Sequence, residues 1–499
     1  MKRLAAACAL LGALWAAAPA AAVDFGANDD SGKFADDGGA VFFAQMAAAG
    51  LKQNVMTVRW LPGTSMIPDV EDLDRSVPVA VASGIEVAFA VYPYPPSAIE
   101  SGQAKPADFA TWVDGLARRY PDVTTYIVGN EPNINTFWRA QGNGKGAIYS
   151  GATFGRFLAA GYDALKAISP EMTVLGVGSS PRGDRAPGWA GKSSPVHFLK
   201  SLGDWYRASG RTLPLMDGFS FHPYPNPSNF TVPFTYTYGW PNAGIHELTR
   251  VKQALWDAFD GTPQPTTLQG LKLYLDEVGW QVGTMAVDAA YTGVENVRVT
   301  TEATQAAIYE DLVRFVVCDP DVAQVNFFGY YDERDRGGWQ SALRRLNGTE
   351  RPSHTAVTAA IEATGGTCQG PPRWWQPQRR PLGAAVSFLP AKRVQAKTHN
   401  LFEFRVRVNE DVTMKAGLVP AGTPVSLIPN LVGGTRSVLA YTKEPKSFVA
   451  VPRSAGRVVL AVFLTAKMNS TRVALFRSPA FTVGPAPLRP RDPIRYGVR

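Results

Sequence analysis

Thr125-Tyr-Ile-Val-Gly-Asn-Glu-Pro-Asn133 places a carboxylate directly after a short apolar run. Tyr126, Ile127 and Val128 are typical of a buried strand, and a glycine ends the run. The proline after Glu131 fixes its own backbone and removes a hydrogen-bond donor, which predicts a rigidly held acid at the mouth of a fold. The alternative is an ordinary turn opened by Asn and Pro, so the rest of the chain must decide between the two.

Outward from this stretch, short apolar runs alternate strictly with helical segments. The expected strands contain few polar residues, as strands buried on both faces do. They cover residues 23–26, 54–59, 85–92, 125–128, 172–177, 217–221, 271–275 and 323–328. Eight strand–helix units in sequence predict an α/β fold, a (β/α)8 TIM barrel spanning residues 23–370. A doubly wound open sheet is the competing architecture, but residues 25–28 are not the Gly-rich phosphate turn that it would need.

The sequence changes character after residue 370. Residues 371–384 form a Pro/Arg-rich linker, and residues 402–408 alternate strictly as a half-buried strand does. Further strands are expected at residues 413–417, 425–428, 437–441, 447–451, 457–464 and 472–476. A small immunoglobulin-like β-sandwich over residues 385–485 is therefore predicted, followed by a tail over residues 486–499.

The charge reverses at the same boundary. Residues 23–370 hold 27 Lys and Arg against 37 Asp and Glu, a balance of −10, whereas residues 371–499 hold 21 against 5, a balance of +16. The acidic part argues against a nucleic-acid partner, because phosphate needs cations. The basic part is either a solvated face or a surface for an anionic cell-wall polymer.

Residues 1–22 have the features of a bacterial-type secretory signal peptide: a basic start, an apolar run and small residues at the end. We therefore expect a secreted or cell-wall-associated protein with no transmembrane segment after cleavage. Two cysteines remain, Cys318 and Cys368, which we predict to form a disulfide; two separate buried thiols are the alternative. No nearby histidine pair accompanies them, which argues against a structural zinc site.

In a (β/α)8 barrel, functional residues lie where strands end and the following loops begin. Glu131 follows the fourth strand and Glu277 ends the seventh, so two carboxylates should face each other across the barrel mouth. Glycoside hydrolysis needs such a pair. Aromatic residues that could stack on sugar rings follow the fourth strand and crowd the loop after the sixth: Phe137, Trp138, Phe230, Phe234, Tyr236, Tyr238 and Trp240. We interpret Phe230 and Phe234 as packing residues, and Asp332 and Glu333 as loop acids.

Asn130-Glu131-Pro132, Leu275-Asp-Glu277, Gly279-Trp280 and His222-Pro-Tyr224 resemble motifs of the clan A glycoside hydrolases, notably families 39 and 5. The resemblance implies a retaining β-glycosidase without metal or organic cofactor, acting on poly- or oligosaccharides by double displacement. Glu131 would be the acid/base and Glu277 the nucleophile. Substrate-binding roles would fall to Asn130 at the sugar 2-hydroxyl, to Arg59 in support of the ionised nucleophile, and to His222, Tyr224, Trp280 and Trp339. Gly129 departs from the bulky residue usual in the clan.

Two expectations and two alternatives accompany this hypothesis. The carboxyl groups should lie about 5–5.5 Å apart, the retaining separation. The nucleophile should stay ionised beside Arg59 and Tyr224, while burial and a neighbouring carboxylate should raise the pKa of the acid/base. The alternatives are a non-catalytic carbohydrate-binding surface protein on a barrel scaffold and a transglycosylase of the same clan.

Overall fold

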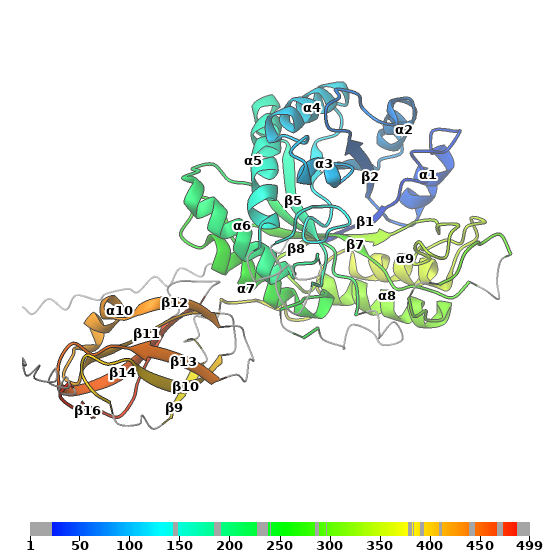
Figure 1. Ribbon diagram of the computed structural model, residues 1–499. Helices are drawn as coiled ribbons and strands as arrows, with labels where there is room; N and C mark the ends of the chain where they lie inside the picture. Colours follow the sequence, from blue (N-terminus) through cyan, green and yellow to red (C-terminus); the bar gives the residue numbers. More distant parts are fainter. Residues whose placement is uncertain are drawn as a thin grey trace, which may run out of the picture. The chain divides into compact units, whose positions relative to one another are not determined.

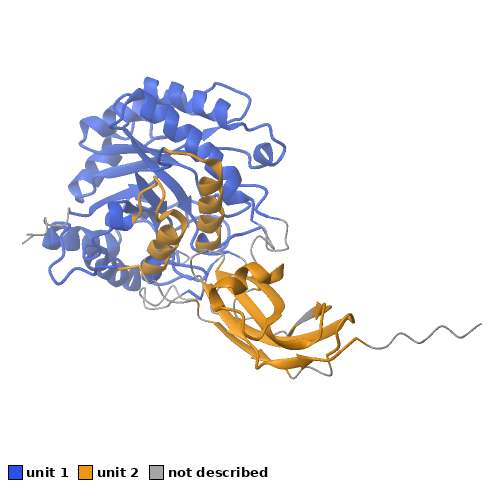
Figure 2. Cartoon of the chain, turned by 90° about the vertical axis from the view of Figure 1, so that its left-hand side faces the viewer, with its two compact units in different colours: residues 1–195, 213–248, 267–375 blue, residues 196–212, 249–266, 376–499 orange. Residues whose placement is uncertain are grey.

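The computed structural model describes most of the chain. The described residues are 22–142, 148–183, 191–226, 238–239, 241–284, 289–295, 297–377, 382, 384–389, 394–408, 412–438, 445–466 and 473–486. The predicted signal peptide, except residue 22, and the predicted tail, except residue 486, lie outside these ranges. Two compact units are distinguished, one of residues 1–195, 213–248 and 267–375, the other of residues 196–212, 249–266 and 376–499 (Figure 2).

The first unit contains a closed parallel barrel, which confirms the predicted fold class (Figure 1). Its strands pair in chain order, and β8 returns to β1. They are β1 (Asp24–Asn28), β2 (Gln53–Trp60), β3 (Glu86–Pro93), β4 (Thr125–Val128), β5 (Thr173–Ser179), β6 (Gly218–Phe221), β7 (Lys272–Val278) and β8 (Val322–Phe328). Parallel closure brings all eight carboxyl ends to one rim, which is why residues far apart in sequence can share one site.

Helices follow the strands along the chain, as the alternation predicts. They are α1 (Ala40–Ala48), α2 (Val70–Ala82), α3 (Ser97–Glu100), α4 (Pro106–Arg119), α5 (Ser150–Ile168), α6 (Pro195–Ser209), α7 (Leu248–Phe259), α8 (Glu302–Val316) and α9 (Pro352–Thr364). Local chemistry fixes several of their ends. Pro106 and Pro352 begin α4 and α9, where a missing N–H costs nothing, and Thr301 caps α8 by accepting the N–H of Thr304.

The barrel interior is filled by side chains that each strand directs inward. Five buried residues form one cluster there: Val55, Ala88, Ala90, Ile127 and Leu175. A disulfide joins Cys318, just after α8, to Cys368, just after α9, with 4.5 Å between their Cα atoms. The two last helices of the barrel are thereby linked covalently.

The second unit includes two antiparallel sheets. One has the strand order β13 (Pro445–Ala450), β10 (Asn400–Val408), β9 (Ala384–Phe388); the other has the order β12 (Gly433–Val438), β11 (Val412–Pro420), β14 (Gly456–Ala466), β15 (Val473–Arg477), with β16 (Phe481–Val483) paired to β14. Alternate residues of β10, β11 and β14 share one buried core, among them Phe404, Met414 and Val462. A sandwich of two sheets with this common core agrees with the predicted fold class.

The strand expected at residues 425–428 was wrong. Val425–Leu427 is a 3-10 turn (η3) and Ile428–Leu431 a short helix (α10). Pro424 precedes the turn and Pro429 lies in the first turn of α10, where proline favours helical backbone and could not donate to a sheet. Residues 384–388 and 481–483, which were not predicted as strands, are β9 and β16.

Candidate active site

The ends of β4, β6 and β7 bring three carboxylates around one imidazole. Nδ1 of His222 lies 3.3 Å from Oε1 of Glu131 and 3.2 Å from Oε2 of Glu277. Its Nε2 lies 3.3 Å from Oδ2 of Asp276. The two glutamate oxygens are therefore at most about 6.5 Å apart, the total of the 3.3 Å and 3.2 Å contacts with the same nitrogen. The acid pair expected from the sequence meets at the barrel mouth.

The backbone at the end of β4 explains both Gly129 and the orientation of Glu131. Gly129 has a φ of +112°, and a Cβ there would lie 2.7 Å from the carbonyl oxygen of Val177 and 2.8 Å from the ring of Phe154. Glu131 itself has a φ of +42°, and its N–H donates to the carbonyl of Gly178 at 2.7 Å. A bulky residue has no room at position 129, and the strained conformation of Glu131 is typical of a functional residue.

The acid cluster favours the charged form of His222. Its side chain is 1 % exposed, and burial opposes the imidazolium. The carboxylates of Glu277, Asp276 and Glu131 outweigh this and raise the pKa of His222 well above its ordinary value. The imidazolium thus partly balances the negative charge of the acid cluster.

Glu277 has the clearest perturbation in the site. Burial, with Glu131 and Asp276 adding to it, raises the pKa of Glu277 to about 8. His222 and the hydroxyl of Tyr224, which donates to Oε2 at 3.0 Å, act in the opposite direction. The pKa is therefore raised at Glu277, the residue assigned as the nucleophile. This differs from the expectation that its surroundings keep the carboxyl group of Glu277 ionised.

No hydrogen bond or ion pair joins Arg59 to Glu277 among the described contacts, although the resemblance implies that Arg59 supports the nucleophile. It lines the cavity from the end of β2, but its Nε donates to the hydroxyl of Tyr92 at 3.1 Å, and its guanidinium lies 5.1 Å from the ring centre of Tyr94. Among the described residues, Arg59 makes no ion pair with a carboxylate. The residue that donates to Glu277 is Tyr224, together with Asn28, whose Nδ2 is 3.5 Å from Oε1.

Of the two tryptophans expected to bind substrate, one lines the cavity and the other is buried away from it. Trp339 stacks on Tyr224 with ring centres 4.6 Å apart and 26° between the planes, and both line the cavity, as does Asn130. Trp280 is fully buried and packs edge-on against Tyr309 of α8, 6.0 Å away. This placement corrects the expectation that Trp280 binds substrate, because its indole fills space between β7 and α8 and does not reach the cavity.

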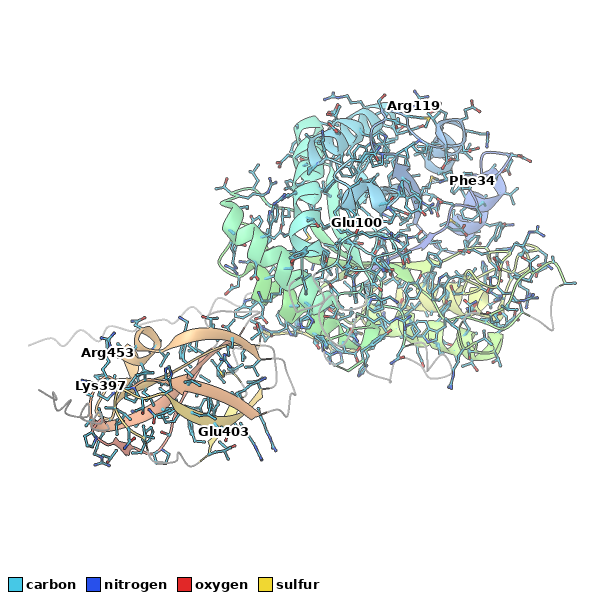
Figure 3. All side chains as sticks on the ribbon, viewed as in Figure 1. Phe34, Glu100, Arg119, Lys397, Glu403 and Arg453 are labelled. Carbon is cyan, nitrogen blue, oxygen red and sulfur yellow. A yellow bond between two sulfur atoms is a disulfide. The ribbon has the colours of Figure 1, made fainter. Side chains whose placement is uncertain are left out.

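The cavity around these residues has a volume of about 680 Å³, within the range of small-ligand sites. Phe34, which is 52 % exposed and labelled in Figure 3, and Phe137 line it as further apolar surfaces. Trp138 is buried instead. Of the aromatic loop after β6, only Tyr238 lies within the described residues; it is buried and lines the cavity.

Asp276 was missed as a site residue, and the strand geometry explains why. Successive side chains of a regular strand point to opposite faces, so Asp276 and Glu277 should not act together. The pairing of β7 with β8 shifts register between Leu275 and Val278. This irregularity allows both carboxylates to contact His222. Neighbouring acids at a strand end are the only sequence signal for it.

Asp332 was interpreted as a loop acid, but this interpretation was wrong. Its side chain is buried and forms an ion pair with Arg351. Both its oxygens accept from Arg351, at 2.6 Å and 2.5 Å, and both side chains are at most 1 % exposed. Tyr291 donates to the same carboxylate at 2.5 Å. Burial raises the pKa of Asp332, although Arg351 opposes the rise. Glu333, in contrast, is exposed.

Asp332→Asn should lower the free energy of unfolding by about 3 kcal/mol, because it leaves the Arg351 cation buried without its main partner. Urea unfolding followed by tryptophan fluorescence measures this. Arg118→Gln is the control, since it breaks the exposed pair with Asp114 on α4 and should change stability little. An equally small effect of both substitutions would contradict the structural role of the buried pair.

Within the described residues, three or more His, Cys, Asp or Glu side chains are nowhere arranged to hold a metal ion. None of the helices described here has the length and apolar character needed to cross a membrane.

Comparison with known proteins finds structural similarity only. No protein family matches the chain, and no curated protein matches it. Solved structures that resemble it include a xylanase 10B from Thermotoga maritima (12% identity, 68% of this chain and 95% of that one, TM-score 0.41), an endo-1,4-beta-mannanase from Rhizomucor miehei (13%, 68% and 94%, 0.43) and a family 1 β-glucosidase from Thermotoga maritima (12%, 66% and 86%, 0.44). At these scores the similarity adds nothing to what the barrel and its site show.

Proposed function

We propose that the protein is a retaining β-glycosidase that hydrolyses O-glycosidic bonds of poly- or oligosaccharides. The observation that supports this most directly is the approach of Glu131 and Glu277 to one nitrogen of His222 inside an aromatic-lined cavity. Inverting enzymes hold their carboxyl groups about 6.5–9.5 Å apart to admit a water, so the upper bound of about 6.5 Å favours double displacement.

In this mechanism the anomeric carbon exchanges one oxygen for another twice. Glu131 protonates the leaving oxygen while a carboxylate oxygen of Glu277 attacks the anomeric carbon, so that the glycosidic bond breaks and a glycosyl-enzyme forms. Glu131, now a carboxylate, removes a proton from water, which attacks the same carbon and releases Glu277. Tyr224 holds Oε2 of Glu277 throughout. Asn130 and Trp339 line the cavity, and in this proposal they contact the sugar.

Secretion and a cell-wall location belong to the same proposal. They rest on the signal-peptide features of residues 1–22 and on the balance of +16 in residues 371–499. A basic domain would hold the enzyme on an anionic polymer, and salt should weaken that attachment.

Labelling of the nucleophile tests the proposed function. An aryl 2-deoxy-2-fluoro-glycoside with a good leaving group forms the glycosyl-enzyme but slows its hydrolysis. A panel of such glycosides should add one sugar to the peptide that contains Glu277, as read by mass spectrometry, and the reacting member identifies the glycone. Turnover of substrates with a label on another residue, or with no label, would contradict the assignment of Glu277.

A further inference from the structure

Arg59 is a cation of the catalytic cavity that makes no ion pair with any carboxylate in the part of the chain that the structure describes. Its partners are Tyr92 and Tyr94, both uncharged, and burial, only partly offset by Arg59, raises the pKa of Tyr92 to about 12, so this hydroxyl stays protonated. One of the five N–H donors of the guanidinium is used in the bond to Tyr92. The side chain is exposed, so the remaining donors are accessible from the cavity.

Six of the seven acids that line the cavity have other partners, and the seventh, Glu333, is exposed. Asp30 is the carboxylate that contributes to the pKa of Arg59, but it accepts the N–H of Thr57 at 2.9 Å and lies 3.3 Å from the buried Nζ of Lys33. Asp29 accepts backbone N–H groups of Tyr330 and Tyr331. Asp332 pairs with Arg351, and the three acids of the catalytic cluster share His222.

Further basic groups lie around the same cavity and in the second unit. Arg182, which is exposed, and Lys192 line the cavity from the segment after β5. In the second unit, basic side chains are exposed on or beside the sheets: Lys397, Arg405, Arg407, Arg453, Arg457 and Arg477, of which Lys397 and Arg453 are labelled in Figure 3. The cavity thus holds three basic side chains beside its acids, and residues 371–499 carry a positive balance of their own.

We infer that the substrate is an acidic glycan, whose sugar units carry carboxylate or sulfate groups, and that Arg59 binds one of these groups. The inference rests on the proposed function and specifies its substrate class. A guanidinium fork matches the two oxygens of a carboxylate or sulfate, and a charge-assisted bond of this kind is stronger than a neutral one. The role differs from support of the nucleophile, which Tyr224 and His222 provide.

Paired substrates test the inference. Each pair has the same linkage and leaving group and differs in charge: aryl glucosides against aryl glucuronides, and neutral polysaccharides against uronate-bearing or sulfated ones. The wild-type enzyme should prefer the acidic members, and salt should lower kcat/KM for them more than for the neutral members. Arg59→Gln should lower kcat/KM for the acidic members about 10- to 100-fold, well beyond its effect on the neutral ones, and Arg59→Lys should restore part of the loss.

Controls separate this inference from the proposed function. Arg118→Gln removes one positive charge from α4 and should leave the preference unchanged. Binding of both series to the Glu277→Gln variant, measured by calorimetry, decides the inference even without turnover. A preference for neutral members, or an equal effect of Arg59→Gln on both series, would overturn the acidic substrate class while leaving the glycosidase intact. Absence of hydrolysis and of labelling at Glu277 would overturn the proposed function instead.

Discussion

Glu277→Gln should reduce kcat by about 10⁴- to 10⁶-fold, the scale on which loss of a nucleophile acts. The amide keeps the shape of the carboxylate and can still accept the hydroxyl of Tyr224, but it cannot form the glycosyl-enzyme. The thermal midpoint should not fall, because the substitution removes one of three acids crowded around His222. Activity within tenfold of wild type, in a folded variant, would refute the assignment.

Glu131→Ala should show a different pattern, and the difference is what identifies the acid/base. A glycoside with a good leaving group needs no proton, so its kcat/KM should change little, whereas a poor leaving group should lose about 10²- to 10⁴-fold. Azide, small enough to enter the space left by the carboxylate, should restore turnover and give a product of retained configuration. An equal loss for both leaving groups would mean that Glu131 is not the proton donor.

The barrel and the acid pair could be predicted because one regularity governs both. Buried parallel strands are short and apolar, and closure of eight of them forces their carboxyl ends together. Glu131 and Glu277 therefore meet although 146 positions separate them in the printed sequence. The prediction needed only the order of strands and the residue type at each strand end.

The remaining site features depend on local geometry that residue patterns do not record. Because the register of β7 shifts near its end, the side chain of Asp276 lies in the site. Trp280, just after β7, packs against Tyr309 of α8. Arg59 contacts Tyr92 and Tyr94, and the sequence does not show which nearby groups its side chain reaches. Whether Asp332 is a loop acid or a buried ion partner depends on Arg351, which is 19 positions away. In each case the partner of the side chain depends on the folded structure, because several chemically similar partners are compatible with the sequence.

The pKa of Glu277 predicts an unusual dependence of activity on pH. Only the carboxylate form attacks, and the pKa is raised to about 8, so the nucleophile is mostly protonated at neutral pH and ionises as pH rises. For an aryl glycoside with a good leaving group, kcat/KM should therefore increase with pH through about 8, since proton donation by Glu131 is not required for that substrate. A rate that is flat from pH 6 to 9 would contradict the raised pKa.

Tyr224→Phe should move that rise to higher pH, which ties the profile to Glu277 specifically. The hydroxyl donates to Oε2 at 3.0 Å and thereby favours the carboxylate, so its loss raises the pKa further. Tyr331→Phe is the matched control, because Tyr331 also lines the cavity but donates to Gln45 at 2.6 Å and does not contact Glu277. An equal shift in both variants would indicate a general change in the cavity. A shift confined to Tyr224→Phe would show that the ionisation of Glu277 governs the first chemical step, and that the hydroxyl of Tyr224 helps to hold its charge.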